Sequence, residues 1–362
     1  MNDHAYMARA IQLAKLGNFT AHPNPRVGCV IVKDQVIVAE GWHEKTGGPH
    51  AEVMALAIAG EQAEGATVYV TLEPCSHTGR TPPCADALVN AGVRRVVIAM
   101  QDPNPRVAGT GFERLRNAGI EVSVGLLESE ARRINPGFIR RMEWGLPYVR
   151  LKMAVSLDGR TAMASGESKW ITGEAARADV QKLRARSSAI VTGAGTILSD
   201  DPSLSVRTET VTRQPLRVIV DSHLSTPPDA KILAEDGEVL VVTVSEDAEA
   251  SMALVDAGAE ITQLSSAAHG VDLPELMQYL AERECNEVLI EAGATLAGSA
   301  LSSRIVDELV IYVAPHLMGS DAKGMFNMPE LQTMQDRIEL AIQDVRMVGD
   351  DLRITALVQY KD

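Results

Sequence analysis

The chain of 362 residues is long enough for two domains, each with its own hydrophobic core. Its formal net charge of −14 argues against binding to a nucleic-acid backbone, which needs a basic face. No apolar run reaches the ~18 residues of a membrane span, and the start of the chain, Met1-Asn2-Asp3-His4, lacks the pattern of a signal peptide. We therefore expect a cytoplasmic protein with neither a nucleic-acid nor a membrane partner.

The first half of the chain alternates helical and strand patterns. Apolar residues at helical spacing predict a helix that is capped by Asp3 and ends near Gly17. Further elements are predicted as strands at 27–32, 36–40, 66–72 and 94–100, helices starting at 49 and 82, and a helix-strand pair ending near 127. This alternation predicts an α/β domain. It lapses after Glu128, and we place the domain boundary near residue 145.

Three short segments of the first half carry metal-binding chemistry: Pro49-His50-Ala51-Glu52, Glu73-Pro74-Cys75 and Pro82-Pro83-Cys84. One imidazole and two thiolates suit a catalytic zinc, which keeps its fourth tetrahedral position for water. Zinc lowers the pKa of this water to about 7, and Glu52 is then the expected proton shuttle. Because Glu52 is predicted in the first turn of a helix, the helix dipole favours its ionised form. A structural zinc, with His43 or His77 as its fourth ligand, is the alternative.

The His-x-Glu and Pro-Cys segments match the pattern of the zinc-dependent base deaminases. In most such deaminases two residues lie between the two cysteines, whereas eight residues lie between Cys75 and Cys84. This longer loop resembles that of the bifunctional deaminase/reductases of riboflavin biosynthesis. The resemblance implies a cytidine-deaminase-like three-layer α/β domain at 1–145. It also implies a substrate pocket lined by Asn24, His43, His77, Arg80, Asp102 and Asn104.

The second half, 146–362, opens with a strand that ends in Ser156-Leu157-Asp158-Gly159. A helix is predicted at 174–186, and strands at 189–192, 216–221, 239–244, 287–291, 308–314, 338–347 and 352–359. Small residues from Gly293 onward follow the strand at 287–291, so that a pyrophosphate could approach the next helix N-terminus. Neither a GxGxxG nor a Walker A sequence is present, which disfavours a Rossmann or P-loop domain.

The opening strand resembles that of dihydrofolate-reductase-like enzymes, and in particular the reductase half of the riboflavin enzymes. The resemblance implies a reductase that uses NADPH. The implied cofactor contacts are Ala154, Trp170, Thr196, Asp200, Ser222, Gly293, Ala294, Thr295 and Leu296. The implied substrate contacts are Ser168, Arg184, Leu204, Arg207 and Glu291. Lys152, on the opening strand, is the predicted proton donor. Ser225 departs from the family pattern, because many relatives carry Arg there to recognise the 2′-phosphate of NADP.

The resemblance implies two reactions on one small molecule. The first half would remove the ring amino group of 2,5-diamino-6-ribosylamino-4(3H)-pyrimidinone 5′-phosphate with Zn²⁺. The second half would reduce the ribosyl group of the product to ribityl with NADPH. We also expect a homo-oligomer. The alternative function is a nucleoside or RNA deaminase with an accessory nucleotide-binding domain.

Overall fold

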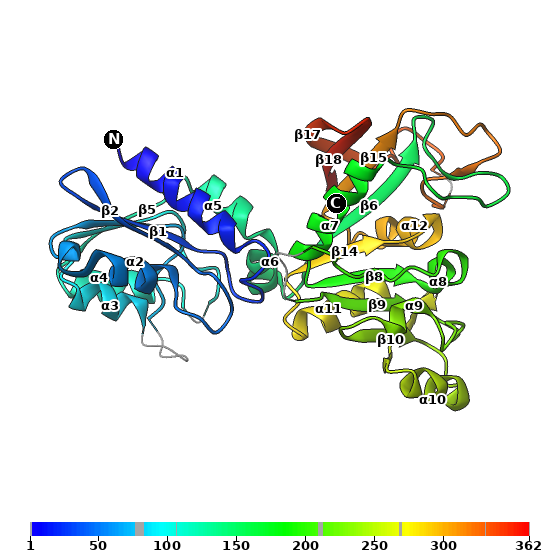
Figure 1. The fold of residues 1–362 in the computed structure, drawn as a ribbon, viewed down its shortest axis with the longest axis horizontal. Helices are drawn as coiled ribbons and strands as arrows, with labels where there is room; N and C mark the ends of the chain where they lie inside the picture. Colours follow the sequence, from blue (N-terminus) through cyan, green and yellow to red (C-terminus); the bar gives the residue numbers. More distant parts are fainter. Residues whose placement is uncertain are drawn as a thin grey trace. The chain divides into compact units, whose positions relative to one another are not determined.

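The computed structural model describes residues 2–76, 83–105, 107–208, 213–267, 270–329 and 331–361. The chain divides into two compact units, Met1–Gly145 and Leu146–Asp362, each built on its own sheet (Figure 1). Within the described ranges, no helix is both long and apolar enough to cross a membrane.

The first unit contains a five-stranded sheet in the order β2-β1-β3-β4-β5. Its strands are β1 (Gly28–Lys33), β2 (Val36–Trp42), β3 (Thr67–Val70), β4 (Arg95–Ile98) and β5 (Glu121–Val124). Strand β1 is antiparallel to β2 and β3, whereas β3, β4 and β5 are mutually parallel. The carboxyl ends of β3 and β4 therefore meet at one edge, where α/β sheets form their ligand sites.

Helices cover both faces of this sheet (Figure 1). One face packs against α1 (Asp3–Ala14), α5 (Glu128–Ile134) and α6 (Pro136–Trp144), and the other against α2 (Ala51–Ala59), α3 (Cys84–Asn90) and α4 (Thr110–Asn117). Short 3-10 helices, η1 (Lys15–Gly17) and η2 (Gly60–Ala63), follow α1 and α2. The alternation of side chains along β1 explains the layering, because Val30 and Val32 face one helical layer while Cys29 and Ile31 face the other. The three-layer α/β prediction is confirmed.

The first helix begins differently from the prediction. Asn2, not Asp3, is its N-cap, and its Oδ1 accepts the N–H of Ala5 at 3.2 Å. Asp3 instead accepts the hydroxyl of Tyr69 at 2.7 Å and pairs with Arg95 at 2.9 Å. Asp3 is drawn away from the capping position by Tyr69, which lies 66 residues away in the chain. The local sequence therefore could not show that Asn2 is the N-cap.

The second unit contains a nine-stranded sheet in the order β11-β10-β9-β8-β14-β6-β15-β18-β17. Its strands are β6 (Tyr148–Ser156), β8 (Ala189–Gly193), β9 (Leu216–Val220), β10 (Val239–Thr243), β11 (Glu260–Gln263), β14 (Glu287–Glu291), β15 (Glu308–Ala314), β17 (Glu339–Val348) and β18 (Asp351–Gln359). Two small sheets pair β7 (Arg160–Ala162) with β16 (Lys323–Gly324) and β12 (Ser266–Ala267) with β13 (Gly270–Val271). Strands β11 to β15 in this order run parallel, and the β17–β18 hairpin closes the edge antiparallel.

Helices also cover both faces of the larger sheet. One face packs against α7 (Glu174–Arg186), α8 (Ala194–Asp200), α9 (Lys231–Ala234) and α10 (Ala248–Asp256), and the other against α11 (Leu273–Glu282) and α12 (Ala294–Ser302). Strand β6 lies between β14 and β15 near the middle of the sheet. Its odd-numbered residues from Val149 to Val155 enter the apolar core with α11 and α12, so its even-numbered residues point to the opposite face.

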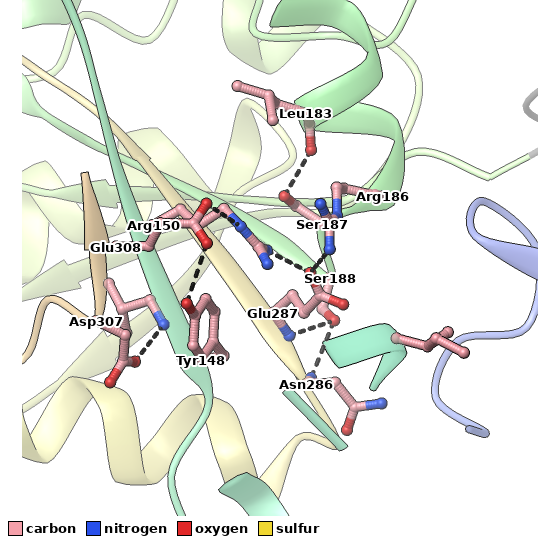
Figure 2. Close-up of polar contacts among 12 residues, drawn as sticks. Tyr148, Arg150, Leu183, Arg186, Ser187, Ser188, Asn286, Glu287, Asp307 and Glu308 are labelled. Atoms are coloured by element: carbon pink, nitrogen blue, oxygen red, sulfur yellow. Dashed lines mark hydrogen bonds and ion pairs between the residues drawn. The ribbon is translucent and has the colours of Figure 1, made fainter. Parts of the chain in front are cut away.

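Charged residues are buried at the start of β6, on the face that α7 covers (Figure 2). The Arg150 guanidinium pairs with Glu287 of β14 and, at 2.9 Å, with Glu308 of β15. Arg186, from the end of α7, reaches Glu287 at 3.1 Å, and the ring of Tyr148 lies 4.7 Å from the Arg150 guanidinium. A charged group that is removed from water is costly unless it has a partner of opposite charge. The cluster therefore favours the register in which Arg150 of β6 lies beside Glu287 of β14 and Glu308 of β15.

Candidate active sites

The three predicted zinc ligands come together in the first unit. His50 is the N-cap of α2, Cys75 follows β3, and Cys84 is the first residue of α3. Their donor atoms all lie within 4.8 Å of one another. The Nδ1 of His50 is 3.1 Å from Cys84 Sγ and 3.6 Å from Cys75 Sγ. Ideal zinc bond lengths and tetrahedral angles require a nitrogen-to-sulfur separation of about 3.6 Å, so the residues fit a zinc ion.

The backbone around the cysteines favours the thiolate that zinc binds. The N–H of Cys84 donates to Cys75 Sγ at 3.3 Å, and the N–H of Ala85 donates to the Cys75 carbonyl at 3.1 Å. A hydrogen bond from the Cys84 thiol, together with those from His50 and the Cys84 N–H, lowers the pKa of Cys75 to about 4. The same interaction with Cys75, together with burial, raises the pKa of Cys84. The N–H of Cys84 at the start of α3 thus favours the thiolate form of Cys75 that zinc binds.

Glu52 lies in the first turn of α2 and is only 3% exposed. Burial raises its pKa to about 7, against smaller opposing contributions from hydrogen bonds and from His50. Burial thus opposes the helix dipole, and with a pKa near 7 both the ionised and the protonated form of Glu52 are accessible at neutral pH. His50 was expected inside the first helical turn, but it precedes the helix in an extended conformation. A carboxyl with a pKa near 7 suits proton transfer at neutral pH.

His43 and Asn24 form a hydrogen-bonded pair beside this cluster. Nδ1 of His43 lies 3.0 Å from the Pro49 carbonyl oxygen, which can only accept, so Nδ1 carries the proton. The other nitrogen then accepts from Asn24 Nδ2 at 3.1 Å, which orients the amide of Asn24. Burial lowers the pKa of His43 and favours this neutral form. With both nitrogens engaged, His43 is not a fourth metal ligand, and the cluster found in the described residues has three members.

Asp102 and Asn104, the other described members of the predicted pocket, lie on the loop that follows β4. The residue that holds this loop was not among the predicted site residues. It is Glu73, which is 3% exposed and accepts the backbone N–H of Asp102 at 3.2 Å. The Glu-Pro-Cys spacing was the only available signal. His77 and Arg80 lie outside the described residues.

In the second unit, Lys152, Arg184 and Glu291 form one ion-pair cluster. Arg184 binds the Glu291 carboxylate through two nitrogens, at 2.6 and 3.0 Å, and Lys152 Nζ lies 3.3 Å from the same group. Burial of Glu291 acts to raise its pKa, but the charges of Arg184 and Lys152 outweigh burial and hold it at about 2. The cluster joins the middle of β6 and the carboxyl end of β14 to the last turn of α7.

The turns that begin α8 and α12 both contain small residues and are joined by a hydrogen bond. Gly293, the N-cap of α12, donates its N–H to Thr196 Oγ1 of α8 at 3.3 Å. The first turn of α12, which contains Ala294, Thr295 and Leu296, has no acidic residue and no side-chain cap. The positive end of the helix dipole therefore stays available to an anion such as a dinucleotide pyrophosphate.

The remaining predicted contacts are distributed around these turns. Ser168 donates to Asp200 at 3.3 Å, the Arg177 guanidinium stacks 4.6 Å from the exposed Trp170 ring, and Ala154 lies two residues after Lys152 on β6. Ser222 accepts the N–H of Val271 at 3.3 Å. Leu204 is buried, whereas the side chain of Arg207 is exposed.

Comparison with known families identifies one family in each unit. The model of the cytidine and deoxycytidylate deaminase zinc-binding region matches residues 1–100, and the model of the RibD C-terminal domain matches residues 147–354. The riboflavin biosynthesis protein RibD of Escherichia coli strain K12 is 51% identical over 365 residues, which cover 97% of this chain and 98% of that protein. This chain belongs to the RibD family.

Solved structures of RibD proteins have the same fold. Acinetobacter baumannii RibD superposes with a TM-score of 0.92 at 49% identity, over 99% of both chains. A deaminase/reductase from Thermotoga maritima superposes with a TM-score of 0.87 at 35% identity, over 98% of both chains. The chain is thus a bifunctional deaminase/reductase of riboflavin biosynthesis, with a zinc site at His50, Cys75 and Cys84. Its fold joins a cytidine-deaminase-like domain to a dihydrofolate-reductase-like RibD domain, as predicted, and the alternative of an RNA deaminase is not supported.

Proposed function

We propose that the first unit deaminates 2,5-diamino-6-ribosylamino-4(3H)-pyrimidinone 5′-phosphate, and that the second reduces the ribosyl group of the product with NADPH. The result is 5-amino-6-ribitylaminouracil 5′-phosphate. The observation that carries the deaminase proposal is the meeting of His50, Cys75 and Cys84 beside a buried Glu52. RibD proteins act on pyrimidine phosphoribosyl compounds.

In the deaminase reaction, Glu52 transfers the protons. When bound to His50, Cys75 and Cys84, zinc acts as a Lewis acid that lowers the pKa of water at its open position. The Glu52 carboxylate takes a proton from the water that attacks the amino-bearing ring carbon, and passes it to the ring nitrogen. It then takes the proton of the hydroxyl group that has added to the ring carbon and delivers it to the amino group, so that the ring carbonyl forms as the C–N bond breaks and ammonia leaves. General acid–base catalysis of this kind contributes ~10²–10⁴-fold to the rate.

The pocket residues recognise the pyrimidine and its phosphate. Asn24 donates one N–H of its side-chain amide to His43. Its amide oxygen then points away from His43 and can accept a hydrogen bond from the substrate. Asp102 and Asn104 would contact the substrate from the loop after β4. His77 and Arg80 keep their predicted roles, with Arg80 as the phosphate partner through charge-assisted bonds.

In the reductase reaction, the residues of β6, α7 and β14 would hold the sugar. NADPH, when bound, supplies the hydride that goes to the sugar C1 of an opened, imine-like form. Lys152 protonates the ring oxygen as the sugar opens, and Glu291 keeps the Lys152 Nζ in place at 3.3 Å. Arg207 offers an exposed cation to the phosphate, and Ser168, Leu204 and the Glu291-bound Arg184 are the other proposed substrate contacts.

The dinucleotide would lie along the adjacent turns of the second unit. The open first turn of α12, with Gly293 and Thr196, takes its pyrophosphate. Ala154, Trp170, Asp200 and Ser222 are the other proposed contacts. Ser225 donates to Asp221 at 3.0 Å and offers no cation to a 2′-phosphate. The preference for NADPH over NADH therefore depends on residues near Ser225 and not on Ser225 itself.

Two broader proposals concern assembly and compartment. We retain the homo-oligomer, supported by β17 at the edge of the larger sheet, where Ile342, Val345 and Met347 are 64%, 53% and 62% exposed. An edge strand with exposed apolar side chains favours pairing with a second copy. We also retain the cytoplasm as the proposed compartment.

Separate assays of the two halves test the proposed function. The deaminase assay follows ammonia release from the diaminopyrimidine without NADPH. The reductase assay supplies the deaminated compound with NADPH or NADH. Glu52→Gln should keep one zinc per chain, lose at least ~10²-fold in deamination and leave reduction unchanged. Full deamination by this variant would refute the role given to Glu52.

A further inference from the structure

Glu73 connects the zinc site to a separate part of the first unit. It precedes Pro74 and Cys75, and its side chain is buried. One carboxylate oxygen, Oε2, accepts the N–H groups of Asp102 at 3.2 Å and Gly109 at 3.0 Å. The other, Oε1, accepts the N–H of Gly111 at 2.8 Å. A single side chain thus satisfies three backbone donors that lie 29 to 38 residues away.

These bonds hold both ends of the 102–109 loop at one point. Asp102 begins the loop, and Gly109, at φ +85°, ends it as the N-cap of α4. The carboxylate also meets the N–H groups at the start of this helix, where a negative charge is favoured. Charge-assisted hydrogen bonds of this kind are stronger than neutral ones. The ends of the loop are therefore fixed relative to the segment that carries Cys75.

Close packing reinforces the connection between α4 and the Glu73-Pro74 segment. A Cβ added at Gly111 would lie 2.2 Å from the Pro74 carbonyl oxygen and 3.0 Å from Glu73 Cγ. The backbone of α4 therefore touches the segment directly, which only glycine permits. A second contact joins Ser76 Oγ to Thr110 Oγ1 at 2.5 Å.

The described part of the loop is ordered from within by its own polar groups. Asp102 Oδ1 accepts the N–H of Asn104 at 2.8 Å, and the Asn104 carbonyl accepts the N–H of Val107 at 2.9 Å. These bonds shape the loop itself, whereas the hydrogen bonds of Asp102 and Gly109 to Glu73 join both of its ends to the segment that carries Cys75.

We propose that Glu73 is a positioning residue of the deaminase, which sets the distance between the metal ligands and the substrate-contacting 102–109 loop. This inference rests on the proposed function, in which Asp102 and Asn104 bind the pyrimidine. Glu73 touches neither substrate nor metal and acts through the loop. A misplaced loop weakens substrate binding, so the Michaelis constant responds more than the chemical step does.

Only a carboxylate of this length meets all three donors. Glutamine has the same size, but its NH₂ group would face either the Gly111 N–H or the pair from Asp102 and Gly109. At least one buried N–H would then lose its acceptor. Glu73→Gln is therefore the test substitution, and Glu113→Gln, on the exposed side of α4, is the matched control.

The experiment measures zinc content, deamination kinetics and reduction in the same full-length preparation. For Glu73→Gln we expect one zinc per chain, a KM for deamination raised roughly tenfold or more, a smaller change in kcat, and normal reduction of the deaminated compound. Glu113→Gln should match the unchanged chain in all four quantities. An unchanged KM would overturn the proposal, and so would loss of zinc, because Glu73 would then act on Cys75 instead of on the loop.

A second measurement decides the matter if Glu73→Gln does not fold. Hydrogen exchange of the Asp102 and Gly109 amides in the unchanged chain should be slow, and slower still with the deaminated product bound. Exchange at the rate of an open loop would overturn the proposal. Absence of deamination by the unchanged chain would instead refute the proposed function, so the two failures are distinguishable.

Discussion

Replacing Glu291 by glutamine should destabilise the second unit in a way that depends on pH. The carboxylate is buried and binds Arg184 through two nitrogens and Lys152 through one. Glutamine keeps the volume but removes the charge, so both cations lose their partner in a poorly hydrated site. The neutral amide closely imitates the protonated acid, which links the mutation to the titration of Glu291.

The magnitude follows from the pKa of Glu291. The cluster lowers it from an ordinary 4.5 to about 2. Each unit corresponds to about 1.4 kcal/mol, so ionised Glu291 contributes about 3 kcal/mol to the free energy of unfolding. A lowered pKa means that this contribution is complete above pH 4.5 and disappears as the pH falls through about 2.

Urea unfolding followed by circular dichroism provides the assay, with the transition of the second unit compared between wild type and Glu291→Gln. The difference should be about 3 kcal/mol at pH 7 and should shrink steadily between pH 4.5 and pH 2. Glu282→Gln makes the same chemical change at an exposed position of α11 and should have little effect at any pH. Equal stability of wild type and Glu291→Gln at pH 7, or a difference independent of pH, would refute the reasoning.

Three further predictions concern the metal, the reductase and the buried charges. Removal of zinc by a chelator should abolish deamination and leave reduction intact, because the three ligands lie in the first unit; parallel loss of both activities would contradict separate sites. Lys152→Ala should lower the reductase kcat by roughly 10²-fold or more, as expected for loss of a general acid, with deamination as the internal control. An unchanged reductase rate would remove Lys152 from the mechanism. Arg150→Met should cost about 3–5 kcal/mol in urea unfolding, since it removes the central cation from the buried Glu287 and the partly buried Glu308; a variant as stable as wild type would show that apolar packing compensates fully.

The zinc site could be predicted from sequence because its chemistry is concentrated in short segments. His50 and Glu52 are two residues apart, and each cysteine follows a proline at the end of a recognisable strand or the start of a helix. Part of the second unit was predicted with similar accuracy, whereas α10 and β11 were not predicted. Helix α7 and strands β14 and β15 have the expected bounds, since each has a clear pattern and clear stops. The small pairs β7–β16 and β12–β13 have too few residues to show any periodicity.

Errors arose where a residue has partners that are distant in the chain. Asp3 was expected to cap α1, but a tyrosine and an arginine of the sheet bind it instead. The layers packed over Glu52 remove its hydration and raise its pKa to about 7. A local pattern contains no information about distant partners or about burial, so neither feature could be predicted from it.

The sequence by itself determined the alternation of strands and helices, the three zinc donors and the acid beside them, since these depend on residue types at short spacing. The tertiary structure alone decided which charges meet. Arg184 and Glu291 are 107 residues apart, and Glu73 and Gly111 are 38 apart. Hydrogen bonds and ion pairs act over a few ångströms of space, so only the folded sheet, with its fixed order and register, brings such residues within reach.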